Sequence, residues 1–182
     1  MNLKKLCVFC GSAAGNDPKY MELGRQLGVM LAKNKIALVY GGASIGLMGA
    51  IADSVMENGG TVIGVIPKAL VDYEVAHSGL SQLFIVDNMH QRKQLMYDNA
   101  DLFLSLPGGM GTLDEMFEVL TWTQLKYHQK PSYILNFEGF YDSLLAYLKH
   151  SNHEGFVKNE HLELLTEIKV LSQLEKVLLQ GV

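Results

Sequence analysis

The chain has 182 residues, of which 48% are hydrophobic and 19% charged, and its formal net charge is −4. This composition is typical of a globular protein, and we expect one domain that spans residues 1–182. The acidic balance makes nucleic-acid binding a poor hypothesis, and no stretch reaches the roughly 20 apolar residues of a membrane span. The first apolar run is also too short for a signal peptide, so we expect a cytoplasmic protein.

Short apolar runs alternate with amphipathic segments along the whole chain. In chain order, we expect a strand at residues 6–9, a helix at 18–33, a strand at 36–40, a helix at 46–58 and strands at 61–66 and 82–86. A helix at 88–99 and a strand at 102–106 follow, and then a helix at 112–127, a strand at 132–135 and helices at 141–150, 159–167 and 172–179. The Asp17-Pro18 pair is typical of a helix start.

The expected strands are nearly continuous apolar runs, which is typical of strands covered on both faces. Their alternation with helices predicts an α/β fold. We expect a single-domain, doubly wound, Rossmann-like and mostly parallel sheet with helices on both faces. In such sheets, ligands bind at the carboxyl ends of the strands.

Glycine loops follow three of the expected strands, at residues 10–15, 41–49 and 107–115. Glycine lets the backbone approach a ligand closely, and the amides of a helix start favour an anion such as phosphate. None of the loops has the dinucleotide-binding or the triphosphate-binding pattern, which counts against a kinase or an ATPase. Because all three lie at one sheet edge, they predict a nucleotide or sugar-phosphate pocket. To this pocket we assign Gly11, Ser12, Gly41, Gly42, Met48 and Gly108.

The third loop, Pro-Gly-Gly-Met-Gly-Thr-Leu-Asp-Glu, leaves two roles open for its acidic end. Thr112 and Glu115 match the S/T-x-x-E capping box, in which the glutamate only returns a hydrogen bond to the helix start. Alternatively, Glu115 faces the pocket as an ionised carboxylate that stabilises a cation or orients water.

Three further groups of residues allow a structural and a functional interpretation. Cys7 and Cys10 have the spacing of a redox pair or half a metal site, but on a strand they point to opposite faces and can simply be buried. No second cysteine pair and no histidine spacing completes a metal site, so we expect no metal. Arg92 and Lys93 fit either a solvated surface or, through the planar fork of Arg92, a phosphate or carboxylate contact.

Two motifs together resemble a known family. The pattern P-G-G-x-G-T-x-x-E is complete at residues 107–115, and M-H-x-R-K is present at residues 89–93. With the glycine loops and Thr121-Trp122, they make residues 5–150 similar to the Lonely Guy (LOG) family of cytokinin riboside 5′-monophosphate phosphoribohydrolases. This family was once labelled lysine decarboxylase-like. Ala13 and Ala43 stand where Ser and Gly are commoner, and the tail after residue 150 carries no motif.

The resemblance implies hydrolysis of the N-glycosidic bond of an N6-modified adenosine monophosphate, which releases the base and ribose 5-phosphate. It implies Arg92 and Glu115 as the catalytic pair, no cofactor, and a homodimer or larger homo-oligomer. The implied substrate-binding residues are Glu74, Arg92, Lys93, Gly109, Met110, Gly111, Thr112, Leu113, Asp114, Glu115 and Thr121. No lysine stands out as a carrier of pyridoxal phosphate, which counts against a decarboxylase. The alternative is a non-catalytic nucleotide or cofactor carrier with the same loops.

Overall fold

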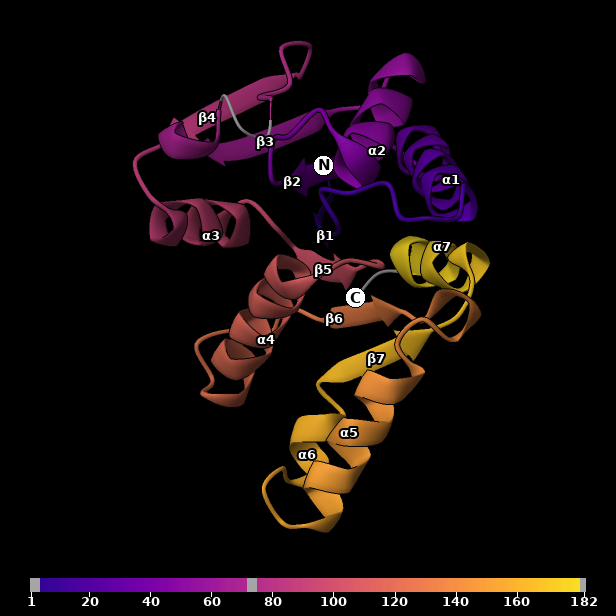
Figure 1. Ribbon diagram of the computed structural model, residues 1–182, viewed down its shortest axis with the longest axis vertical. Coiled ribbons are helices and arrows are strands. Elements are labelled where there is room, and N and C mark those ends of the chain that lie inside the picture. The colour runs from indigo at the N-terminus through magenta and orange to yellow at the C-terminus, as the bar shows by residue number, and fades with distance from the viewer. Residues whose placement is uncertain (1–3, 72–74, 181–182) are drawn as a thin grey trace.

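The computed structural model describes residues 4–71 and 75–180. Its centre is one seven-stranded, fully parallel sheet in the order β4-β3-β2-β1-β5-β6-β7 (Figure 1). The expected doubly wound α/β architecture is confirmed. The strands are β1 (Lys5–Phe9), β2 (Ala37–Tyr40), β3 (Val62–Pro67), β4 (Gln82–Val86), β5 (Leu102–Ser105), β6 (Ser132–Leu135) and β7 (Leu165–Ile168).

Helices connect most successive strands and cover both faces of the sheet, whereas β3 and β4 are joined through a short 3₁₀ turn (Figure 1). They are α1 (Lys19–Lys33), α2 (Gly46–Glu57), α3 (Met89–Asp98), α4 (Met110–Gln124), α5 (Asp142–His153), α6 (Asn159–Leu162) and α7 (Leu171–Gln180), with short 3₁₀ turns η1 (Lys68–Leu70) and η2 (Phe137–Gly139). No described helix is both long and apolar enough to span a bilayer.

Alternate strand residues form two cores, one on each face of the sheet. On one face, Leu6, Val8 and Cys10 of the β1 segment pack with helices α1, α2 and α7. On the other face, Cys7 and Phe9 pack with α3, α4 and the start of α5. The two cysteines therefore point to opposite faces and remain buried thiols, so the redox-pair interpretation is wrong.

The helix expected at residues 159–167 is also wrong. Helix α6 ends at Leu162, and residues 165–168 form β7, which pairs in parallel with β6. The backbone N–H of Asn136 donates to the carbonyl of Ile168 over 2.8 Å, which holds the end of β7 next to the end of β6. Without β7, strand β6 would present an unpaired edge, so the hydrogen bonds of the sheet outweigh local helix propensity.

Candidate active site

The order of the sheet reverses between its two central strands. From β1 the chain builds outward through β2, β3 and β4, and then returns to place β5 on the other side of β1. The loops that leave β1 and β5 therefore lie side by side, and the amide of Gly11 donates to the carbonyl of Pro107 over 3.2 Å. This switch point is where doubly wound sheets bind their ligands.

A cleft of about 270 Å³ opens at this point. It collects residues from the ends of β1 and β2, from η1 and from the first turns of α2, α3 and α4. Its lining residues are Val8, Cys10, Gly11, Ser12, Gly41, Met48, Leu70, Met89, Arg92, Gly109, Met110, Gly111, Thr112, Asp114 and Glu115.

The glycine turn brings the N-terminus of α4 to the cleft. Gly109 is the N-cap and no side chain caps the helix, so α4 begins at Met110, two residues before the expected start. Thr112 is consequently the third helical residue and not the cap, which excludes the capping box with Glu115. The amides of the first helical turn have no partner within the helix and favour an anion in the cleft.

A glycine is needed at position 108 because Thr112 packs directly against it. A Cβ atom at Gly108 would collide with the hydroxyl oxygen of Thr112. That hydroxyl is buried and has no hydrogen-bond partner among the described residues. The turn therefore holds a polar atom at the cleft that lacks a partner within the described protein.

Arg92 brings a buried positive charge into the same cleft. Helix α3 begins at the N-cap Asn88, whose side chain accepts from the amide of Gln91 over 3.0 Å. Arg92 lies one turn further and is only 5% exposed. Its Nε atom has no hydrogen-bond partner in residues 4–71 and 75–180, and Nη1 contacts the Met89 sulfur at 3.8 Å. A buried guanidinium in this setting favours an anionic ligand.

The charges of Glu115 and Arg92 both affect the pKa of the Cys10 thiol, which lines the cleft. Burial is the main cause that raises the pKa of this thiol, the negative charge of Glu115 raises it further, and Arg92 acts in the opposite direction. The cleft thus carries a carboxylate and a guanidinium within one electrostatic environment. This arrangement suits a substrate that carries negative charge at one end and develops positive charge at another.

Lys93 follows Arg92 in sequence but serves another contact. Its ammonium lies 3.0 Å from Asp114 and 3.2 Å from Glu118, both on α4, and it does not line the cleft. Burial opposes ionisation, but the hydrogen bonds that the ammonium donates to the two carboxylates raise the pKa of Lys93. The ammonium therefore links α3 to α4.

The cleft gathers most of the residues that the sequence assigns to a pocket. These are Gly11, Ser12, Gly41, Met48, Arg92, Gly109, Met110, Gly111, Thr112, Asp114 and Glu115. Glu74 lies outside the described residues. The structure does not bring five others into the cleft, namely Gly42, Lys93, Gly108, Leu113 and Thr121.

Each of these five has a structural contact of its own. The carbonyl of Gly42 accepts from the amide of His77 over 2.9 Å, and Leu113 packs in the core beneath α4. The exposed Thr121 hydroxyl donates to the carbonyl of Phe117 over 2.7 Å. Substrate roles for Lys93, Leu113 and Thr121 remain predictions from the family pattern, and those for Gly42 and Gly108 remain predictions from the glycine loops.

Four lining residues escaped the sequence analysis. Val8 and Cys10 precede Gly11, so the end of β1 was a usable signal for both. Met89 lies one turn before Arg92, and this i, i+3 spacing was a second signal. Leu70 comes from η1, and no pattern in the sequence marks it.

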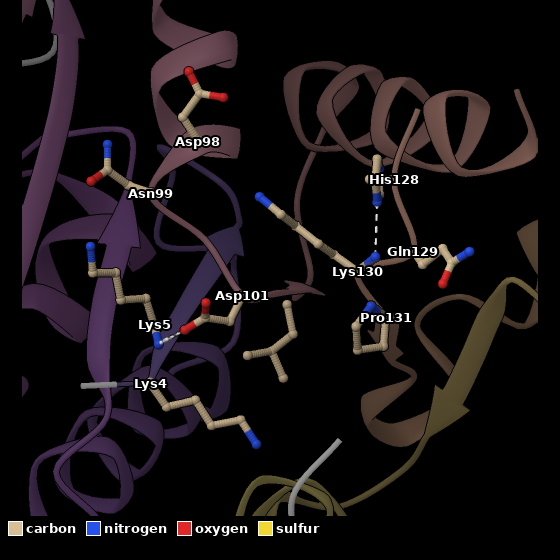
Figure 2. Close-up of a pocket in the computed structure, with 10 residues that line it drawn as sticks. Lys4, Lys5, Asp98, Asn99, Asp101, His128, Gln129, Lys130 and Pro131 are labelled. Carbon is tan, nitrogen blue, oxygen red and sulfur yellow. Dashed lines mark hydrogen bonds between the residues drawn. The ribbon is translucent and has the colours of Figure 1, made fainter. Parts of the chain in front are cut away.

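A larger groove of about 860 Å³ lies at the opposite, amino edge of the sheet (Figure 2). Its side chains come from the residues before β1, β5 and β6, and its polar groups are largely paired. The amide of Lys5 donates to Asp101 over 2.7 Å. His128 donates to the carbonyl of Val119 over 3.1 Å and accepts from the amide of Lys130 over 3.0 Å. None of the residues that the sequence assigns to the pocket lines this groove.

No three His, Cys, Asp or Glu side chains gather as a metal site in the described part of the chain.

Comparisons with known proteins agree with the family pattern. A family described as "Possible lysine decarboxylase" matches residues 48–178. A cytokinin riboside 5′-monophosphate phosphoribohydrolase of Rhodococcoides fascians is 48% identical over 155 residues, which is 85% of this chain and 78% of that protein. One from Arabidopsis thaliana is 49% identical over 154 residues, which is 85% of this chain and 72% of that protein.

A solved structure extends the comparison to the fold. The molybdenum cofactor binding protein from Rippkaea orientalis superposes with a TM-score of 0.73 and covers 99% of this chain and 98% of its own. The two sequences are 18% identical, so this likeness concerns the fold alone.

The word decarboxylase in the family description implies pyridoxal phosphate, and the cleft does not fit it. Such an enzyme holds its cofactor as a Schiff base on a lysine. None of the residues that line the cleft, within the described ranges, is a lysine.

Proposed function

Because this chain belongs to the LOG family of cytokinin riboside 5′-monophosphate phosphoribohydrolases, we propose that it hydrolyses the N-glycosidic bond of adenosine 5′-monophosphates. The products are an adenine-type base, modified at N6 in the cytokinin case, and ribose 5-phosphate. Water forms the new bond to C1′ of the ribose, while the electron pair of the broken bond leaves with the base.

One observation carries this proposal. Arg92, Thr112 and Glu115 all line this cleft, and two of them have a buried polar atom without a described hydrogen-bond partner, Nε of Arg92 and the hydroxyl of Thr112. Buried polar groups in folded proteins are nearly always hydrogen-bonded, so this pair marks the place of a polar ligand. The adjoining N-terminus of α4 favours an anion there.

The chemistry divides between the two ends of the cleft. The amides of Met110, Gly111 and Thr112 hold the 5′-phosphate, which fixes the ribose in the cleft. Breaking the glycosidic bond builds positive charge on the ribose, in an oxocarbenium-like transition state. Glu115 opposes this charge and orients the attacking water. Arg92 contributes its fixed positive charge to the phosphate, the ribose or the departing base.

Product analysis of the Glu115→Gln variant tests the proposal. The wild-type protein is incubated with AMP, N6-isopentenyl-AMP, GMP and CMP, and the released bases are separated by chromatography. We expect base release from the adenosine monophosphates by the wild type and none by Glu115→Gln. Glu57→Gln, a matched change at an exposed residue at the far end of α2, serves as the control.

The outcomes separate an enzyme from a carrier. A binding protein needs the glycine loops but not the carboxylate. Nucleotide binding without base release by the wild type would therefore favour a carrier, and full turnover by Glu115→Gln would remove the catalytic role of that residue.

We also propose that the protein is cytoplasmic and forms a homodimer or a larger homo-oligomer. The family resemblance supports the second part. Light scattering of the purified protein measures the mass of the assembly, and a monomer would contradict the second part.

A further inference from the structure

Lys93 forms a bridge between the two helices that carry the proposed catalytic pair. It follows Arg92 on α3, and its ammonium contacts Asp114 at 3.0 Å and Glu118 at 3.2 Å on α4. These two carboxylates stand immediately before Glu115 and three residues after it. The Lys93 side chain is 13% exposed and that of Glu118 24%, whereas Asp114 is 58% exposed, so the bridge is shielded from solvent mainly at its lysine end.

Lys93 itself lies outside the cleft lining, although its partner Asp114 belongs to it. Lys93 and Glu115 line a small cavity between α3 and α4, together with Glu118, and Lys93 is absent from the lining of the main cleft. Lys93 therefore shares this small cavity with the proposed catalytic residue Glu115, while Arg92 and the glycine turn line the main cleft.

Helix α4 carries several carboxylates close together, and Lys93 supplies a positive charge beside them. Asp114, Glu115 and Glu118 put three carboxylates on little more than one helical turn, and like charges at this spacing repel one another. The Lys93 ammonium compensates two of them at short range, Asp114 and Glu118, and its own side chain is largely buried, where charges are screened less than at the surface.

We propose that Lys93 is a positioning residue, which holds α3 against α4 so that Arg92 and Glu115 face the same substrate. This inference rests on the proposed function. It differs from the substrate-binding role that the family pattern implies for Lys93. The neighbouring side chains therefore have different roles. Arg92 faces the ligand, and Lys93 aligns α3 with α4.

Steady-state kinetics of Lys93→Met, Glu118→Gln and the double variant test this division. We expect kcat with N6-isopentenyl-AMP to fall about tenfold or more in Lys93→Met, with KM changed by less than about twofold, because misplacement of reacting groups acts on turnover. Glu118→Gln should lower kcat in the same way. The double variant should lose no more than the worse single variant, since both break one interaction.

Two further measurements separate alignment from general loss of structure. Lys93→Arg keeps the charge and should restore most of kcat. In Lys93→Met, the acidic limb of the kcat profile should move to higher pH, because the three neighbouring carboxylates of α4 have lost the cation that contacts two of them. Lys33→Met, an exposed lysine in the last turn of α1, is the matched control and should behave as the wild type.

The inference and the proposed function fail in different ways. An inert wild type would overturn the proposed function. An active wild type whose Lys93→Met variant shows a large rise in KM with kcat unchanged would overturn the positioning role and assign Lys93 to substrate binding. Additive losses in the double variant would also contradict the bridge.

Discussion

The guanidinium of Arg92 occupies the space in which a side chain at Gly41 would lie. A Cβ atom built on Gly41 would overlap Nη2 of Arg92 and come within 3.1 Å of its Cζ. The end of β2 therefore has to be a glycine for the buried arginine to reach the cleft. Gly41, which directly follows β2, and Arg92 on α3 are far apart in the chain and thus depend on each other.

We predict that Gly41→Ala lowers kcat/KM about 100-fold with little loss of secondary structure, because the added methyl group displaces the guanidinium from the cleft. Assays with N6-isopentenyl-AMP and circular dichroism measure the two effects. Gly79→Ala is the control, since its Cβ would meet only the end of the His77 side chain, at 3.3 Å. Equal activity of Gly41→Ala and Gly79→Ala would contradict the prediction.

Arg92→Lys should also lower kcat/KM about 100-fold, although it keeps the positive charge. Lysine is a point charge and cannot reproduce the planar set of donors that arginine presents to a phosphate or a carboxylate. Arg92→Ala should stop turnover entirely. Near-normal kcat/KM in both variants would return Arg92 to a purely structural role.

The protein should lose stability in alkaline solution. Burial raises the pKa of the Cys7 and Cys10 thiols above the usual 9.0 and that of the Tyr40 and Tyr141 hydroxyls above the usual 10.0. The folded protein therefore keeps protons that the unfolded chain releases. Stability from these groups is complete below about pH 8 and falls as the pH rises through 9 and 10.

Urea unfolding at a series of pH values between 7 and 10.5 measures this effect. The free energy of unfolding should decrease steadily above pH 9 in the wild type. It should decrease less in a Cys7→Ala, Cys10→Ala double variant, which lacks the two thiols. A free energy that stays constant from pH 8 to pH 10.5 would show that these groups ionise in the folded state as in the unfolded chain.

The buried side chain of Asn136 should stabilise the protein, because it joins β6 to β7 and to the start of α5. Its buried amide donates to Asp142 over 2.8 Å and to Glu167 over 2.7 Å, and its oxygen accepts from the amide of Tyr141 over 2.8 Å. We predict that Asn136→Ala loses about 2–3 kcal/mol of unfolding free energy, because the remaining groups are left without partners.

Thermal unfolding tests this prediction, with Asn58→Ala as the control. Asn58 is exposed and its side chain donates only to the carbonyl of Ser54, over 2.8 Å. The loss for this variant should stay below about 1 kcal/mol. Similar melting temperatures for the two variants would contradict a special role for Asn136.

Local patterns were enough to predict the architecture and the edge of the sheet that carries the cleft. Continuous apolar runs such as residues 36–40 indicate strands buried on both faces, and the regular alternation with helices indicates a parallel sheet. The strand β7 could not be predicted in this way. Residues 165–168 become a strand because β6 offers them hydrogen-bond partners, which a window of sequence does not contain.

Some features of the cleft could likewise be predicted from the sequence and others could not. The sequence alone determined that glycine turns would meet at the carboxyl ends of the strands, because glycine content and strand ends are local properties. It left open whether Glu115 belongs to a capping box and whether Arg92 and Lys93 are solvated surface charges. Only the tertiary structure decided these questions. The start of α4, the space beside Gly41 and the ion pairs of Lys93 depend on contacts between distant segments, which form when the helices pack on the sheet.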